Sequence, residues 1–158
     1  SRSPSFAFSA MPAQFDHEKL RAYQEALRFA SWVEPVIEQL SGQLAAKDQL
    51  DRASTSIVLN IAEGNGKRSH PDRCRYLDIA RGSALECAAC LDVLVVRKKL
   101  AETTAVDGKE ILLGVVSLLA GLIARFSGVV QEEEQAPSEA GRTGSIEKNE
   151  TENQKEND

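Results

Sequence analysis

Four polar residues could do chemistry in this chain, since each falls on or beside an otherwise apolar helical stripe. Asn60 and Glu63 belong to one predicted helix, and Ser83 and Glu86 belong to the next. Polar groups in such places must find hydrogen-bonding partners or cost stability. A pair of carboxylates on facing helices can hold a metal ion or exchange protons with a substrate. Metal-binding bundles, however, combine Glu with a Glu-x-x-His motif, and this sequence contains no such motif.

The same residues have a structural interpretation, which we favour over catalysis. If the two helices run antiparallel about the intervening turn, Glu63 comes near Arg73, and Glu86 lies within about one turn of Arg52. An asparagine in a core stripe, as Asn60 is predicted to be, can fix the register of packed helices. The predicted structural polar network consists of Asn60, Glu63, Arg52, Arg73, Ser83 and Glu86.

The histidines and cysteines do not complete a reactive set. His17 and His70 both fall at predicted helix starts, so neither Ser-His-Asp nor Cys-His chemistry is supported. Cys87 and Cys90 form a CxxC inside a predicted helix, and with Cys74 they make an odd number. Such cysteines are typical of helix packing in a reducing compartment. We predict no catalytic residue, no cofactor and no metal, and hence a protein that is not an enzyme.

Two basic clusters flank one long predicted helix. The first follows a Gly64–Asn65–Gly66 turn, which resembles a phosphate-binding loop only superficially, because a true P-loop follows a strand. Exposed basic clusters are usually just solvated, but phosphate contact is the sharper hypothesis. The candidate nucleic-acid contacts are Lys67, Arg68, Arg73 and Arg75 at the start of this helix and Arg97, Lys98 and Lys99 at its end.

Charge is distributed unevenly along the chain. The net charge of −5 arises in residues 131–158, where nine acidic and three basic residues contribute −6. The other 130 residues contribute +1, which does not indicate general nucleic-acid binding. Residues 131–158 have Ile146 as their only large apolar residue, so we predict a disordered acidic tail. We also expect a disordered segment over residues 1–14, which lacks the apolar stretch of a secretory signal, and one domain over residues 15–130.

Hydrophobic periodicity predicts four helices and no strand. Asp16 is a suitable N-cap for the first helix, Pro35 should kink that helix, and Gly42 should end it or close its loop. Gly64–Asn65–Gly66 should end the second helix in left-handed conformations. Amphipathic helices with short connections predict an all-α fold, an antiparallel up-down-up-down four-helix bundle. The last three helices are expected at about 44–63, 71–100 and 106–130.

The fourth predicted helix has an unusual composition. No charged residue occurs from Ile111 to Ala124, and a helix that is apolar on all sides is expected to be buried on all sides. The additional face therefore needs a partner, either a membrane or a second copy of the chain. We favour a second copy, because the uncharged run of 14 residues is too short to span a bilayer. The predicted oligomer interface is a stripe of small residues, Gly114, Ser117, Gly121, Ala124 and Gly128.

The pattern Ser56-Ile57…Asn60-Ile61-Ala62-Glu63-Gly64, followed by Ala80-Arg81-Gly82-Ser83…Glu86, carries a family resemblance. It resembles the four-helix bundle protein family, which includes proteins encoded in intervening sequences of bacterial 23S ribosomal RNA genes. The family is also similar to the accessory variability protein of diversity-generating retroelements. The resemblance implies a cytosolic four-helix bundle that assembles into a homopentameric barrel. For the retroelement relatives, it implies binding to RNA and to reverse transcriptase through a basic surface.

Two functional hypotheses follow from the sequence and the resemblance together. The first is a non-enzymatic, homo-oligomeric scaffold that binds RNA or a nucleic-acid enzyme through its basic clusters. Repetition of each cluster around a pentamer would raise a weak single-site affinity through avidity. The alternative is a protein-binding adaptor with no nucleic-acid role. Both hypotheses place the protein in the cytoplasm, without a membrane and without a small-molecule substrate.

Overall fold

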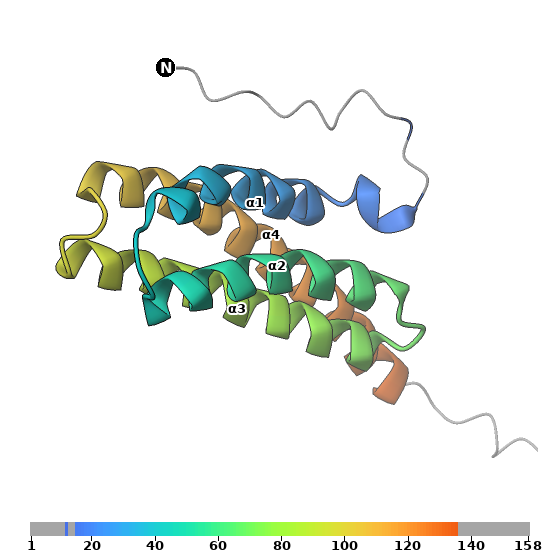
Figure 1. Ribbon diagram of the computed structural model, residues 1–158. Helices are drawn as coiled ribbons and strands as arrows, with labels where there is room; N and C mark the ends of the chain where they lie inside the picture. The colour runs from blue at the N-terminus through green and yellow to red at the C-terminus, as the bar shows by residue number, and fades with distance from the viewer. Residues whose placement is uncertain (1–11, 13–14, 136–158) are drawn as a thin grey trace, which may run out of the picture.

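The fold is all-α over the part of the chain that the computed structural model describes, residue 12 and residues 15–135. A short 3-10 helix, η2 (Asp16–Lys19), precedes four α-helices: α1 (Arg21–Gln39), α2 (Ala45–Gly66), α3 (His70–Val96) and α4 (Glu102–Gln135). Figure 1 shows the four helices side by side, with the α2–α3 connection at one end and the other two connections at the opposite end. The prediction of four helices without strands is confirmed for these residues. The two segments predicted to be disordered lie outside them, except for residue 12 and residues 131–135.

The first predicted helix is divided in two, which corrects the expected start. Asp16 lies inside η2 rather than at an N-cap, and Leu20 has an extended backbone (φ −74°, ψ 125°) that separates η2 from α1. Phe15 rather than Asp16 is the N-cap residue, and its amide donates to Glu18 Oε2 at 3.2 Å. After this break, α1 continues through Pro35 to Gln39, and Gly42 adopts a positive φ of 79° in the following loop.

The end of α2 differs from its prediction in conformation. Neither Gly64 nor Gly66 has a positive φ, and both belong to the last turns of the helix. Gly64 is required for a different reason, since a Cβ added there would lie 2.9 Å from Cβ of Tyr76 on α3. The glycine therefore permits close approach of α2 and α3 rather than a left-handed turn.

Local capping sets the two ends of α3. Ser69 is the N-cap, and its Oγ accepts from the Asp72 amide at 3.3 Å. At the other end, the Lys99 amide donates to the Leu94 carbonyl and the Lys98 amide donates to the Val95 carbonyl, both at 2.8 Å. This pattern is a Schellman motif. Lys98 occupies its left-handed position with φ 58°, where glycine is usual.

The core is formed by one buried stripe from each helix. On α2 the buried positions include Ile57, Ile61 and Gly64, whereas Asn60 is only half-buried. The expectation that Asn60 lies in the core stripe is therefore wrong. At 3.6 residues per turn, the residues three and four positions after Ile57 both lie near its face of the helix. Packing buries the larger apolar side chain, Ile61, and leaves Asn60 at the edge of the buried stripe. The largest fully buried side chains are Phe29, Leu50, Ile57, Ile61, Leu91, Leu94, Leu112 and Leu119.

Helix α4 is buried along one face and exposed along another. Val115 and Leu119 are fully buried, but Leu113 is 67% exposed and Val106 is 50% exposed. Within one copy of the chain, the expected burial on all sides is not achieved. Residues Glu102–Val129 are long and apolar enough to cross a membrane by length and composition, and 22% of their most apolar stretch is buried. Figure 1 shows that the C-terminal part of α4 projects beyond the ends of α2 and α3.

Candidate nucleic-acid interface

The first basic cluster forms one corner of the bundle, at the α2–α3 connection. Lys67 Nζ lies 3.1 Å from Glu63 Oε1 and 4.6 Å from the centre of the Tyr76 ring. The salt bridge to Lys67, with help from the Tyr76 hydroxyl, lowers the pKa of Glu63, and the same carboxylate raises the pKa of Lys67. The Lys67 charge is therefore partly compensated within α2.

Arg73 connects three parts of this corner. Its Nε donates to the Lys67 carbonyl at 2.7 Å, and its guanidinium carbon lies 5.2 Å from the centre of the Phe126 ring. The His70 ring stacks on Phe126 at 5.5 Å. Cation–π and ring contacts of this kind orient the guanidinium, so Arg73 fixes α4 against the first turn of α3 as well as carrying charge.

The remaining two cations of the corner are more accessible. Arg75 lies over the Tyr76 ring at 4.8 Å and reaches Asp72 Oδ1 at 4.0 Å, with the arginine side chain 63% exposed. Arg68 is exposed and makes no ion pair among the described residues. Because α3 begins at this corner, its unpaired amide groups add to the positive potential. The structure thus brings together Lys67, Arg68, Arg73 and Arg75, which we call the basic corner.

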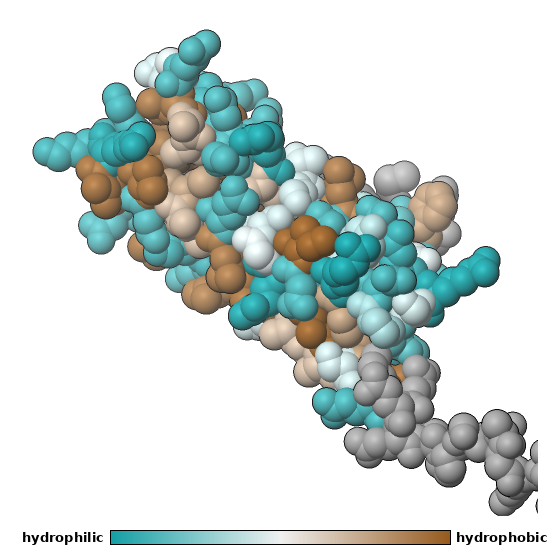
Figure 2. Space-filling view, turned by 90° about the horizontal axis from the view of Figure 1, so that it is seen from below, coloured by the Kyte–Doolittle hydropathy of each residue, from teal (hydrophilic) through white to brown (hydrophobic). Residues whose placement is uncertain are grey.

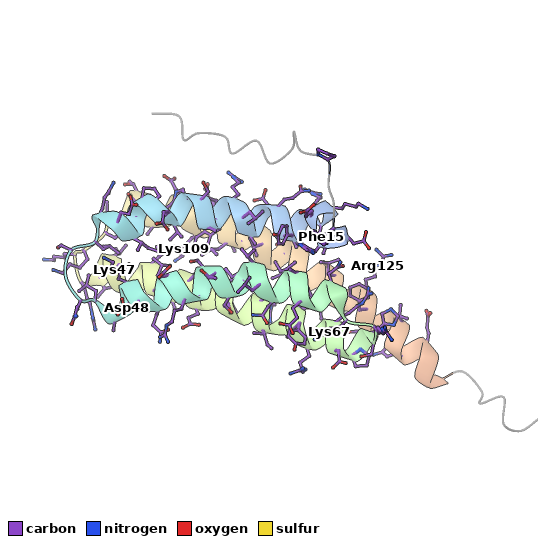
Figure 3. The ribbon with its side chains drawn as sticks, turned by 45° about the vertical axis from the view of Figure 1, so that its right-hand side comes forward. Phe15, Lys47, Asp48, Lys67, Lys109 and Arg125 are labelled. Carbon is purple, nitrogen blue, oxygen red and sulfur yellow. The ribbon has the colours of Figure 1, made fainter. Side chains whose placement is uncertain are left out.

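The second basic cluster lies at the other end of the bundle. Arg97, Lys98 and Lys99 are all exposed beyond the last turn of α3. The 27 residues of α3 span about 40 Å at 1.5 Å per residue. In Figure 3, Lys67 lies at the α2–α3 end of the bundle. The two clusters therefore form separate surfaces of a single chain.

Two of the residues predicted to form a polar network, Asn60 and Ser83, are joined through Ser56 between α2 and α3. The Oγ atoms of Ser56 and Ser83 are 2.9 Å apart, which joins the two helices. Asn60 Nδ2 donates to the Ser56 carbonyl at 2.9 Å and to Ser56 Oγ at 3.0 Å. Ser83 also hydrogen-bonds the Ile79 carbonyl at 3.1 Å. Sequence reasoning omitted Ser56, although its position four residues before Asn60 on the same helix face was a usable signal.

The two expected interhelical bridges have different partners in the structure. Glu63 pairs with Lys67, the C-cap residue of α2, and Arg73 Nε donates to the Lys67 carbonyl. Arg52 donates to Gln49 Oε1 at 2.8 Å, and Glu86 is exposed. Local partners replace the long-range ones because side chains three or four residues apart share a helix face.

An open groove of about 450 Å³ runs along this outer side of α2. Its lining includes the apolar side chain of Leu59, which is 60% exposed. The groove is lined by Asp51, Arg52, Thr55, Ser56, Leu59, Asn60 and Glu63. Its mixture of hydroxyl, amide and charged groups suits a polypeptide rather than a small apolar ligand. Figure 2 shows that, on the underside of the molecule in Figure 1, hydrophobic side chains emerge at several separate places among hydrophilic ones.

The cysteines are placed for packing. Burial raises the pKa of the Cys87 thiol to about 12 and raises that of Cys90 as well, so both stay protonated at neutral pH. Cys74 is half-buried, with Sγ 3.6 Å from Ser127 Oγ and 3.8 Å from the Ile123 carbonyl oxygen. Among the described residues, no group of three or more His, Cys, Asp or Glu side chains could hold a metal ion. The described part of the chain thus offers no ligand set for the metal chemistry considered above.

The stripe of small residues on α4 faces outward. A Cβ added at Gly121 or Gly128 would meet nothing within 4 Å, and one at Gly114 would meet only Glu25 Oε2 at 3.9 Å. Ser117 and Ala124 are exposed between them. The five residues therefore form a shallow track along the surface of one chain, next to the exposed side chain of Leu113.

Comparison with known proteins places this fold in a family. A solved structure of a protein of unknown function from the S23 ribosomal protein family of Bacteroides thetaiotaomicron is similar, with a TM-score of 0.61 and 23% identity. The similarity covers 65% of this chain and 97% of the other, and at this identity it supports the shared fold alone. No significant match is found among curated proteins. The family model of the 23S rRNA-intervening sequence protein matches residues 18–121, which is more than half of the chain. The chain therefore belongs to the 23S rRNA-intervening sequence protein family.

Proposed function

We propose that this protein is a non-enzymatic scaffold that assembles through α4 and binds RNA through its basic corner. In this proposal the chain is an antiparallel up-down-up-down bundle in the cytoplasm, and five copies form a ring. The observation that carries the proposal is the exposed track of α4. A soluble protein rarely leaves a long apolar helix face without a partner.

The assembly step rests on the shape of the α4 track. Its small residues would let the backbone of a second copy approach closely, and Leu113 and Val106 beside it would then be removed from water. A membrane is the competing partner, because α4 passes the test of length and composition. We favour a second copy since Arg125 interrupts the apolar stretch, and charges are costly within a bilayer.

Light scattering coupled to size exclusion tests the assembly. We expect a mass near five times the 17.2 kDa of one chain at two protein concentrations. Gly121→Leu should shift the mass toward the monomer, because the leucine fills space that is open in one copy. Gly82→Leu is the matched control, since Gly82 is also an exposed helical glycine with nothing within 4 Å but lies on α3. A monomeric parent protein that sediments with lipid vesicles would contradict the proposal and favour the membrane.

The RNA-binding step rests on the charges of the basic corner. Arg68 has no ion-pair partner among the described residues, and Arg75 keeps most of its surface in water. Arginine binds phosphate oxygens through its fork of N–H donors. Five copies of the corner around a ring would let weak sites act together on one RNA.

Fluorescence anisotropy with a labelled, mixed-sequence single-stranded RNA tests this step. Arg68→Glu combined with Lys67→Glu should abolish binding and flatten its salt dependence, since each lost phosphate contact lowers the log–log slope by about 0.7. The matched control is Lys98→Glu with Lys99→Glu, which makes the same charge change about 40 Å away. Equal losses in both double variants would show non-specific attraction, and unchanged affinity in the first would remove the corner from the proposal.

A second candidate function is a protein-binding adaptor, favoured by the groove on α2. That groove combines exposed Leu59 with the hydroxyl and amide groups of Ser56 and Asn60. The two candidates differ in what happens when the acidic end of the chain is removed. Because α4 continues to Gln135, the deletion should begin at residue 136. RNA binding that is absent both before and after this deletion would favour the adaptor.

A further inference from the structure

The structure places the end of α4, after which the acidic segment of residues 136–158 follows in the sequence, near the basic corner. Phe126 of α4 contacts both His70 and Arg73, and Ser127 contacts Cys74. These contacts fix α4 on the first turn of α3. Helix α4 then continues for nine residues to Gln135, about 13 Å further along its axis. Helix α4 therefore ends about two and a half helical turns beyond the basic corner.

The two parts are complementary in charge. Residues 136–158 hold six acidic and three basic residues and carry a net charge of −3. In the corner, Glu63 is engaged by Lys67, and Asp72 accepts from Ser69 Oγ at 2.8 Å. Four cations against these two anions leave the corner with an excess of +2. An excess of positive charge attracts an acidic segment of the same chain.

The length of the segment matches the distance to the corner and not the distance to the other basic cluster. The segment has 23 residues, and an unstructured chain of that many residues has a root-mean-square end-to-end length of about 26 Å. That length easily covers the roughly 13 Å back to the corner. The cluster at the far end of α3 lies about 40 Å beyond the corner. The effective concentration of the segment is therefore much higher at the corner.

We propose that the acidic segment Ala136–Asp158 docks on the basic corner of its own chain and competes there with RNA. The competitive part of this inference rests on the proposed RNA-binding role, whereas the docking does not. We take an effective concentration of the segment at the corner of a few millimolar and a dissociation constant of about 1 mM for its docking. Competition should then weaken the RNA affinity by about two- to fivefold. Salt should reduce this factor, since attraction between exposed charges is screened over about 10 Å at 0.1 M ionic strength.

Zero-length carbodiimide cross-linking of the full-length protein tests the docking without RNA. We expect amide bonds between Lys67 and carboxylates of residues 136–158, and few between those carboxylates and Lys98 or Lys99. Mixing isotopically light and heavy chains before the reaction distinguishes links within one chain from links between copies. Equal cross-linking at both basic clusters, or links found only between copies, would overturn the proposal.

RNA affinity of a length-matched variant tests the competition. The variant keeps all 23 residues but replaces every carboxylate of the segment with an amide, so that length and hydrophobicity are preserved. We expect its RNA affinity to rise two- to fivefold at low salt, roughly, and to converge with that of the parent at high salt. If the RNA affinity is unchanged while the parent protein still shows the cross-links, the segment does not compete with RNA. If neither protein binds RNA, the proposed function is rejected, and the cross-linking result alone decides whether the segment docks. The substitutions are Glu139→Gln, Glu147→Gln, Glu150→Gln, Glu152→Gln, Glu156→Gln and Asp158→Asn.

Discussion

Replacing Gly64 with alanine should destabilise the protein, although alanine is the better helix former. Gly64 lies in the last turns of α2, and a Cβ there would lie 2.9 Å from Cβ of Tyr76 and 3.5 Å from the Arg73 carbonyl oxygen. A Cβ atom cannot turn away as the end of a long side chain can. The two helices must therefore separate, which also disturbs the packing of Lys67 and Arg75 on the Tyr76 ring.

The magnitude follows from two opposing contributions. Replacing a helical glycine with alanine favours folding by about 1 kcal/mol. Overpacking a tight contact costs about 1–3 kcal/mol. Gly64→Ala should therefore lower the free energy of unfolding by about 0–2 kcal/mol. Gly82→Ala is the matched control, because Gly82 is helical and a Cβ there meets nothing within 4 Å. It should raise the free energy of unfolding by about 1 kcal/mol.

Urea unfolding followed by far-UV circular dichroism measures both variants. We expect their free energies of unfolding to differ by about 1–3 kcal/mol, with Gly64→Ala the less stable. The measurement should be made at two protein concentrations, because dissociation of an oligomer would make stability depend on concentration. If Gly64→Ala is as stable as Gly82→Ala, the close approach of α2 and α3 at this glycine is not tight, and the reasoning is refuted.

Three further predictions concern local features. Lys98→Gly should raise the free energy of unfolding by about 0.5–1 kcal/mol, because relief of the left-handed strain at φ 58° outweighs the larger conformational entropy of glycine in the unfolded chain. Thermal unfolding measures this change, and a destabilised variant would contradict the strain argument. Ser69→Ala should cost about 0.5–2 kcal/mol through loss of the N-cap, and Ser69→Asp should restore most of it. A thiol reagent should modify half-buried Cys74 well before Cys87 and Cys90 under native conditions, and equal rates would show that burial does not protect the latter two. Because the folded pKa of Cys87 is about 12, above its ordinary 9.0, its contribution to stability should be complete below pH 9 and be lost as pH rises toward 12.

The number and order of the helices could be predicted, whereas their ends could not be predicted equally well. Apolar residues recur every three or four positions, and this period is a property of each helix by itself. The start of the first helix was misplaced because Phe15, and not Asp16, is the N-cap residue of η2, and the extended backbone of Leu20 separates η2 from α1. The left-handed turn expected at Gly64–Asn65–Gly66 was wrong, since glycine at position 64 serves a contact with another helix.

In the candidate site as well, the sequence predicted features that depend on neighbouring residues but not contacts between residues far apart in the chain. The sequence indicated that Lys67, Arg68, Arg73 and Arg75 cluster, because they lie within nine positions of each other around one turn. It could not indicate that Arg73 is engaged by Phe126, which is 53 positions away in the chain. The sequence also predicted Asn60 in the core, because residues three and four positions after Ile57 lie on nearly the same helix face. The packing of the helices buries Ile61 and leaves Asn60 half-buried.

The helical class, the unusually apolar fourth helix and the uneven distribution of charge could all be predicted from the sequence alone. These properties follow from composition and from periodicity within a segment, which need no knowledge of neighbours. Three properties came from the folded arrangement: which side of α4 stays exposed, that the two basic clusters lie at opposite ends of α3, and that α4 ends near one of them. Each of these depends on contacts between residues distant in sequence, and such contacts are set by the packing of whole helices against one another.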